Sequence, residues 1–117
     1  MKICTVGGSG FVGRYSVIEL LLNGHEIINI DLKEFPLEVN SNRFRSIIFD
    51  AKNKFVDLIP KTEVIINFAA LLGGIQYFHK YPATLMLENE RICASVFEQA
   101  AELYLIGDLK KIIQLSS

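Results

Sequence analysis

A glycine-rich turn close to the amino terminus constrains the fold of this chain more than any other feature. Residues 6–13 read V-G-G-S-G-F-V-G and overlap the end of residues 3–6, a short run rich in β-branched side chains. Residues 11–23 then carry apolar side chains at helical spacing, and Gly24 after them is typical of a helix end. A strand that passes through glycines directly into a helix predicts a βαβ unit, in which parallel strands are joined by helical crossovers.

The rest of the chain continues this alternation of strands and helices. Further short apolar runs predict strands at residues 26–31, 46–49, 63–68 and 112–116. The patterns between them predict a loop, a short helix, a second loop and a long helix at residues 33–45, 52–59, 69–81 and 82–104, in that order. Strands that are apolar throughout are typical of a parallel sheet covered on both faces. We therefore expect an α/β fold of the doubly wound Rossmann type, a three-layer αβα arrangement of about five parallel strands in the order 3-2-1-4-5.

Several apolar side chains are expected in the core of such a fold. In the first helix, the spacing predicts a broad buried face made of Val12, Tyr15, Val17, Ile18, Leu21 and Leu22. Large side chains elsewhere that are expected mainly in the core are Phe11, Phe68, Met86 and Phe97, with Phe11 also bordering the glycine turn. Cys4 and Cys93 are both expected as buried, reduced thiols. Because the chain shows no ligands clustered at short spacing, no metal site is expected.

The composition narrows the classes of function. The chain has 117 residues, a hydrophobic content of 50%, a formal net charge of −1 and a pI near 6.1. One domain covering residues 1–117 is expected, and the near-neutral charge gives no reason to expect nucleic acid or an anionic membrane as partner. No apolar stretch reaches the roughly 20 residues that span a bilayer, and the first residues show no signal-peptide core. A cytoplasmic location is therefore expected.

The glycines of the turn, in their strand–turn–helix context, indicate binding of a dinucleotide. We expect Gly7 to allow the tight turn, Gly10 to let a diphosphate approach the backbone, and Gly13 to let the helix pack on the sheet. Phe11 and Val12 open the helix, whose unpaired N–H groups and partial positive charge favour phosphate. The alternative is a tight strand-to-helix turn that binds nothing.

An acidic residue follows the turn at the distance expected of a ribose-binding group. Asp31 ends the second predicted strand, about twenty residues beyond the turn, where a carboxylate accepts hydrogen bonds from both adenosine ribose hydroxyls. A carboxylate there repels a 2′-phosphate, so NAD is expected as the cofactor in preference to NADP. Leu32 and Lys33 come next and are expected beside the same ribose, where the charge of Lys33 could soften that preference. The alternative for Asp31 is an ordinary acidic residue at a strand end that faces solvent.

The spacing G-x-x-G-x-x-G resembles that of the short-chain dehydrogenase/reductase superfamily, and G-G-S-G-F-V-G is similar to its extended branch, the NAD-dependent sugar-nucleotide epimerases and dehydratases. The resemblance covers the whole chain, and residues 1–31 align without gaps with the start of UDP-galactose 4-epimerases. The cofactor positions that it implies are Asp50 and Ala51 near the adenine, Phe68, Ala69 and Ala70 along the cofactor, and Asn89 holding the active-site backbone.

Two further segments resemble parts of these enzymes that meet the substrate. Gly73, Gly74 and Ile75 are similar to a loop that borders the substrate sugar in GDP-fucose synthases and GDP-mannose epimerases. The segment ending in Ser116 and Ser117 resembles the strand that carries the serine of the family's Ser-Tyr-Lys triad. This implies a catalytic serine, with Ser117 favoured over Ser116. The alternative is a pair of serines that make local hydrogen bonds at a strand end.

The sequence departs from this family in its catalytic residues. The family's tyrosine is followed four residues later by a lysine, and no tyrosine of this chain has a lysine at that position. We therefore expect that these residues alone do not turn over a sugar nucleotide and form the NAD(P)-binding part of an epimerase, dehydratase or reductase, truncated before the Tyr-x-x-x-Lys helix and the substrate domain. The alternatives are a stand-alone dinucleotide-binding regulatory or sensor module, and a decayed reading frame. An uncovered sheet edge would favour self-association or a homo-oligomer.

Overall fold

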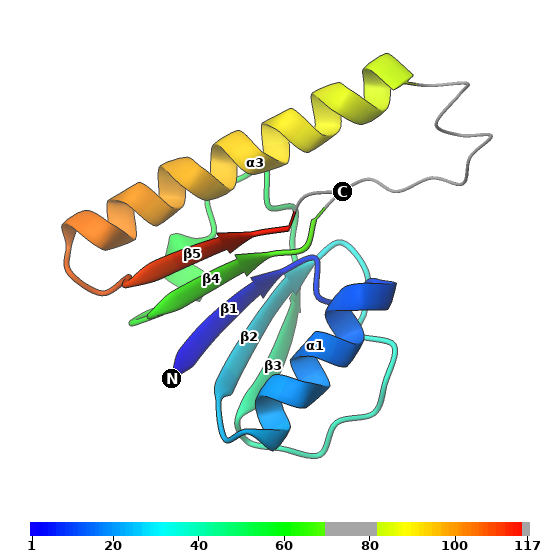
Figure 1. Cartoon of the computed structure of the whole chain (residues 1–117), viewed down its shortest axis with the longest axis vertical. Coiled ribbons are helices and arrows are strands. Elements are labelled where there is room, and N and C mark those ends of the chain that lie inside the picture. Colours follow the sequence, from blue (N-terminus) through cyan, green and yellow to red (C-terminus); the bar gives the residue numbers. More distant parts are fainter. Residues whose placement is uncertain (70–81, 116–117) are drawn as a thin grey trace.

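The computed structural model describes residues 1–69 and 82–115, which form a parallel five-stranded sheet between two helical layers (Figure 1). The strands are β1 (Lys2–Val6), β2 (Glu26–Asp31), β3 (Phe44–Ile48), β4 (Val64–Asn67) and β5 (Lys111–Gln114). They lie in the order β3-β2-β1-β4-β5, and every neighbouring pair is parallel. The expected fold class and strand order are confirmed.

The register of the strands brings three connections to one edge of the sheet. Val6, the last residue of β1, is paired with Ile30 of β2 on one side and with Asn67 of β4 on the other. Parallel strands end at the same edge, so the residues after β1, after β2 and after β4 meet there. In doubly wound folds this carboxyl edge, at the point where the strand order reverses, is where ligands bind.

Two helices cover opposite faces of the sheet. Helix α1 (Phe11–Leu22) packs through Val17 and Leu21 on one face, beside Ile3 of β1. Helix α3 (Pro82–Leu105) covers the other face, where its Val96 packs with Cys4 and its neighbours. Consecutive strand residues point to opposite faces, which is why Ile3 and Cys4 belong to different cores. Figure 1 shows α3 lying along β4 and β5, with α1 beside β2 and β3.

Both helices end in the same way. Gly24 follows α1 with φ +90° and donates its N–H to the carbonyl of Leu21, and Gly107 follows α3 with φ +89° and donates to Tyr104. This left-handed conformation favours glycine and closes the last helical turn. The prediction of a helix end at Gly24 is confirmed. No described helix is both long and apolar enough to cross a membrane.

Two predicted elements differ from the structure. The predicted helix at residues 52–59 is wrong apart from the single 3-10 turn η1 (Val56–Leu58), because the N–H groups of Phe55 and Val56 donate to the side chain of Gln99 on α3. The third strand begins at Phe44, two residues before the predicted start, because residues 44 and 45 pair with β2.

The burial pattern corrects several core predictions. Helix α1 buries a narrow stripe, Gly13, Val17 and Leu21, rather than the broad face predicted. The side chains predicted in the core that are instead exposed are Phe11, Val12, Tyr15, Leu22 and Phe97. Cys4 is buried as predicted and burial raises the pKa of its thiol, whereas Cys93 is only partly buried. For the side chains of α1 the physical reason is that this helix contacts the sheet along one line, so residues a third of a turn or more away from that line face outward.

Candidate functional site

The glycine turn forms the corner between β1 and α1. Gly7 has φ +79°, and a Cβ atom placed on it would lie 2.7 Å from the backbone N and Cα of Ala69. Its N–H donates to the carbonyl of Ile30 at 2.8 Å. Two constraints therefore require glycine at position 7: its backbone is in the left-handed region, and the backbone of Ala69, just after β4, leaves no room for a Cβ atom.

Gly13 and Gly10 are required for different reasons. A Cβ on Gly13 would lie 2.7 Å from the Cα of Gly8, so glycine at this position lets the first turn of α1 press against the glycine turn itself. Among the described residues, a Cβ on Gly10 would meet the carbonyl oxygen of Gly7 at 3.6 Å, an ordinary contact. Packing among the described residues thus explains Gly7 and Gly13 but not Gly10, which is exposed.

The amino end of α1 has the electrostatics of an anion site. Among the described residues, no side chain caps the helix at Gly10, and its first turn contains no acidic residue. The guanidinium of Arg14 lies beside the turn and donates to the carbonyls of Gly10 and Ser9, at 3.2 Å and 3.3 Å. Uncapped amides, the helix dipole and this cation all favour negative charge at the same corner. The arrangement of glycines did not predict the contribution of Arg14.

Asp31 points toward the turn. Its Oδ2 accepts the N–H of Ser9 at 2.9 Å, and its Oδ1 accepts the N–H of Lys33 at 3.2 Å. Each carboxylate oxygen retains capacity for a further hydrogen bond. The side chains of Leu32 and Lys33 are exposed beside it. The structure therefore brings together the predicted turn and the predicted carboxylate.

Sequence reasoning missed the side chain that connects them. Asn29, in the middle of β2, is fully buried, and its Oδ1 accepts from the N–H of Gly8 and from the hydroxyl of Thr5, both at 2.9 Å. Its Nδ2 donates to the hydroxyls of Ser9 and Ser46, both at 3.1 Å. The available signal was a single amide between two isoleucines in the middle of the strand.

The residues at the end of β4 lie beside the glycine turn. Asn67 is fully buried, and its Oδ1 accepts the N–H of Ala69 at 2.9 Å while its Nδ2 donates to Gln114 of β5 at 2.8 Å. Phe68 is partly buried against the core beneath α1. Asn67 thus fixes the course of the chain at Ala69, whose backbone is the neighbour that restricts Gly7.

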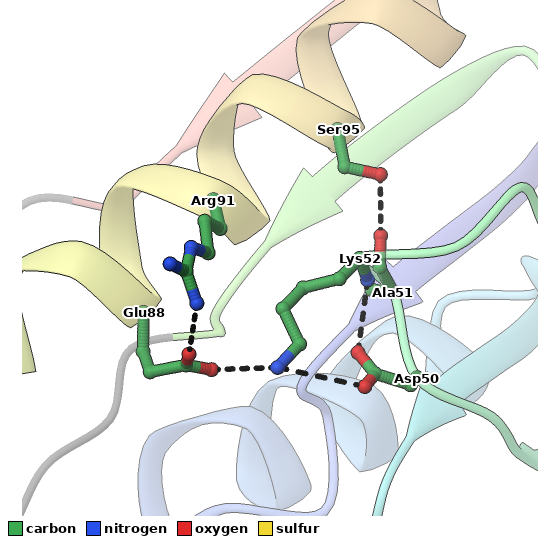
Figure 2. A network of polar contacts seen from close by, with 6 residues as sticks. All are labelled: Asp50, Ala51, Lys52, Glu88, Arg91 and Ser95. Carbon is green, nitrogen blue, oxygen red and sulfur yellow. Dashed lines mark hydrogen bonds and ion pairs between the residues drawn. The ribbon is translucent and has the colours of Figure 1, made fainter. Parts of the chain in front are cut away.

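The segment after β3 is held by charged side chains at the surface (Figure 2). Lys52 Nζ lies 2.7 Å from Glu88 Oε2 on α3 and 3.7 Å from Asp50 Oδ2, and Arg91 also pairs with Glu88, at 3.1 Å. The Asp50 carboxylate in addition accepts the N–H of Lys52 at 2.9 Å. The hydrogen bond between Lys52 and Glu88 is the main reason that the pKa of Lys52 is raised and the pKa of Glu88 is lowered.

A buried side chain of α3 also holds the segment after β3, on the side away from these surface charges. Gln99 of α3 accepts the N–H groups of Phe55 and Val56 through Oε1, and donates through Nε2 to the carbonyl of Asn53 and the hydroxyl of Ser95. That hydroxyl in turn donates to the carbonyl of Ala51 at 2.6 Å, the contact drawn in Figure 2. Asp50 is therefore linked to α3 through Lys52 and Glu88, and Ala51 is linked to α3 through Ser95.

The remaining predicted positions are Asn89 and six residues outside the described ranges. Asn89 lies on α3, one residue after Glu88, and is partly buried. The predicted positions outside the described residues are Ala70, Gly73, Gly74, Ile75, Ser116 and Ser117. Within the described ranges, no three side chains of the kinds that bind metals are grouped so as to hold an ion.

Comparison with known proteins gives a consistent picture. The sequence profile of the NAD dependent epimerase/dehydratase family matches residues 3–117. The chain is 27% identical over 111 residues to the dTDP-6-deoxy-L-talose 4-dehydrogenase (NAD(P)(+)) of Kitasatospora kifunensis, covering 90% of this chain and 34% of that protein.

Solved structures share the fold. A UDP-galactose 4-epimerase superposes with a TM-score of 0.78 at 23% identity, over 100% of this chain and 38% of that one. MoeE5 in complex with UDP-glucuronic acid and NAD gives a TM-score of 0.71 at 21% identity, over 100% of this chain and 37% of that one. The chain thus spans between 34% and 38% of the length of these three proteins.

Proposed function

Because this chain belongs to the NAD-dependent epimerase/dehydratase family, we propose that it binds NAD as the cofactor-binding part of a sugar-nucleotide epimerase, dehydratase or reductase. The diphosphate binds at the turn formed by residues 7–13, and Asp31 accepts hydrogen bonds from the adenosine ribose. Asp50 and Ala51 lie at the adenine. Bound NAD supplies the hydride acceptor for the chemistry of such enzymes.

The observation that carries this proposal is the position of the Asp31 carboxylate against the turn. Ser9 N–H lies 2.9 Å from Asp31 Oδ2, so a molecule bound along the turn by its diphosphate has its adjoining ribose beside this carboxylate. Gly10 supports the same conclusion, because packing among the described residues does not require glycine there and a side chain would extend into the space a diphosphate needs. The uncapped start of α1 supplies the complementary charge.

The substrate class rests on the relatives. MoeE5 was solved with UDP-glucuronic acid and NAD together, and the Kitasatospora protein is named as a dehydrogenase of a dTDP-sugar. The 117 residues contain no tyrosine followed four residues later by lysine. We propose that these residues bind the cofactor without turning over a sugar nucleotide. In the complete active site Ser117, or Ser116, positions the reacting hydroxyl, and Gly73, Gly74 and Ile75 border the sugar.

Calorimetric titration with NAD and NADP tests the cofactor assignment. NAD is expected to bind more tightly than NADP, because the carboxylate repels a 2′-phosphate. Asp31→Ala is expected to weaken NAD binding by about 1–3 kcal/mol, since hydrogen bonds to a charged acceptor are lost. The same substitution should weaken NADP binding less, so that the preference for NAD over NADP becomes smaller.

Glu34→Ala is the matched control, because it removes the same charge from an exposed position three residues away. It should leave the affinity for NAD unchanged. Equal affinities of Asp31→Ala and the unmodified chain for NAD would refute the ribose assignment. A chain that binds no dinucleotide would refute the proposed function as a whole.

A further inference from the structure

The fully buried side-chain amide of Asn29, beneath the glycine turn, makes all the hydrogen bonds that it can make. The carboxamide of Asn29 can accept two hydrogen bonds and donate two, and the structure shows all four, within 2.9–3.1 Å. Its exposed fraction is 0%. A buried polar group is costly unless all of its bonds are made, and an apolar residue would fill this position in a core strand.

The partners of this amide divide into two groups. Two of them, the N–H of Gly8 and the hydroxyl of Ser9, belong to the turn, and the other two, Thr5 and Ser46, belong to the flanking strands β1 and β3. One side chain therefore joins the turn to three adjacent strands. A Cβ on Gly8 would collide with Asn29 Oδ1, so the turn and the amide fit against each other without spare room.

The bonds continue from Ser9 to the ribose side of the site. The hydroxyl of Ser9 donates to the carbonyl of Lys33 at 3.1 Å, and its N–H donates to Asp31. Ser9 is itself buried. The chain of contacts runs from Asn29 through Ser9 to Asp31, and so connects the residues that face the diphosphate with the residue that faces the ribose.

We propose that Asn29 is a positioning residue of the dinucleotide site, which sets the separation between the backbone amides of the turn and the Asp31 carboxylate. This inference rests on the proposed function. Asn29 touches no ligand, and acts by holding Gly8 and Ser9 so that the diphosphate and the ribose of one molecule are bound at the same time. Its loss therefore penalises ligands that carry both groups more than ligands that carry only the ribose.

The test compares NAD with adenosine, which carries the ribose and adenine but no diphosphate. In Asn29→Leu, which keeps the branched shape of the side chain and removes all four bonds, the affinity for NAD should fall at least tenfold, while that for adenosine, measured by NMR titration, changes less than twofold. Asn29→Thr is the second variant should the first not fold. It suits a strand and keeps one hydroxyl, and a loss for NAD of about threefold is expected. Ser46→Ala is the matched control, because it removes a bond to the same amide without touching the turn, and it should leave both affinities unchanged.

The outcomes separate the two proposals. Should the unmodified chain bind NAD and a folded Asn29 variant bind it equally well, the inference is overturned and the proposed function stands. Parallel losses for NAD and adenosine would show a structural role only, and would likewise overturn it. A selective loss for NAD supports it. Failure of the unmodified chain to bind NAD overturns the proposed function, and this inference with it.

Discussion

Two connections at the same edge of the sheet have the same kind of buried support and differ at the surface. The turn after β1, residues 7–13, is held from beneath by the neutral amide of Asn29, with Asp31 as the one acidic side chain shown bonding to it among the described residues. The segment after β3, residues 49–56, is held from beneath by the neutral amide of Gln99 and also from above by the ion pairs of Lys52. Each amide makes four hydrogen bonds. The difference lies at the surface.

This difference indicates which connection is free to receive a charged ligand. At the turn after β1, no described side chain caps the backbone amides at the start of α1. At the segment after β3, by contrast, the charged groups are already paired with one another, since Asp50 and Glu88 both bind Lys52. A site for a diphosphate needs donors that are fixed but unpaired, and buried neutral bonds fix backbone without using its outward groups. The segment after β3, which is proposed to lie at the neutral adenine, has no such need, so charged pairs can hold it.

The largest expected effect is on the turn itself. Gly7→Ala should lower the free energy of unfolding by about 3 kcal/mol, because the methyl group meets the backbone of Ala69 at 2.7 Å and φ is +79°. Thermal or urea unfolding followed by circular dichroism measures the change. Gly24→Ala is the matched control, since Gly24 has φ +90° but its added Cβ would meet, among the described residues outside its own chain neighbours, only Arg43 Nη1 at 3.8 Å, and a loss of about 1 kcal/mol is expected. Equal losses in the two variants would show that the approach of Ala69 costs nothing.

The next effect tests the buried support of the segment after β3. Gln99→Leu should lower the free energy of unfolding by about 2 kcal/mol, because the N–H groups of Phe55 and Val56 lose their acceptor in a buried place. Glu98→Leu makes a comparable change on the exposed side of α3 and should leave stability within about 0.5 kcal/mol of the unmodified chain. An equally small effect of Gln99→Leu would mean that the segment is held by its surface charges instead.

A third prediction separates binding from folding at the turn. Gly10→Ala should leave the free energy of unfolding nearly unchanged, because its Cβ meets one atom at an ordinary 3.6 Å. It should weaken NAD binding about tenfold, or about 1.4 kcal/mol, by obstructing the diphosphate. Calorimetry and thermal unfolding of the same sample give both values. Unchanged affinity would place the diphosphate elsewhere.

The smallest effect is expected from the charged surface of the segment after β3. Lys52→Met should lower the melting temperature slightly at low salt and not at all at roughly 1 M salt, where exposed charges are screened. Lys111→Met, an exposed lysine with no ion pair in the described ranges, should show no salt-dependent loss. A loss that persists at high salt would contradict the assignment of Lys52 to a screened surface pair.

The same pair has a pH signature. Because the pKa of Glu88 is lowered in the folded protein, its contribution to stability is complete above the ordinary value of 4.5 and is lost as pH falls through the folded value. The melting temperatures of the unmodified chain and of Lys52→Met should therefore converge below pH 4.5. A gap that stays constant through that range would exclude the pair as its cause.

Local features were predictable from the sequence and distant ones were not. The turn, the carboxylate of Asp31 and the end of α1 at Gly24 follow from neighbouring residues, and each was predicted. Residues 52–59 looked helical, but their N–H groups donate to Gln99, more than forty residues away. Asn29 had a visible signal, an amide between two isoleucines, but its partners lie on two other strands and in the turn.

The sequence by itself determined the alternation of elements, the strand order and the corner at which a dinucleotide is proposed to bind. Those depend on periodicity, on the backbone freedom of glycine and on the handedness of crossovers, which are local properties. Only the tertiary structure decided which apolar side chains of α1 are buried and which polar ones lie beneath the site. Burial and hydrogen bonding depend on what the fold places opposite a residue, and for Asn29 those partners are spread over β1, β3 and the glycine turn.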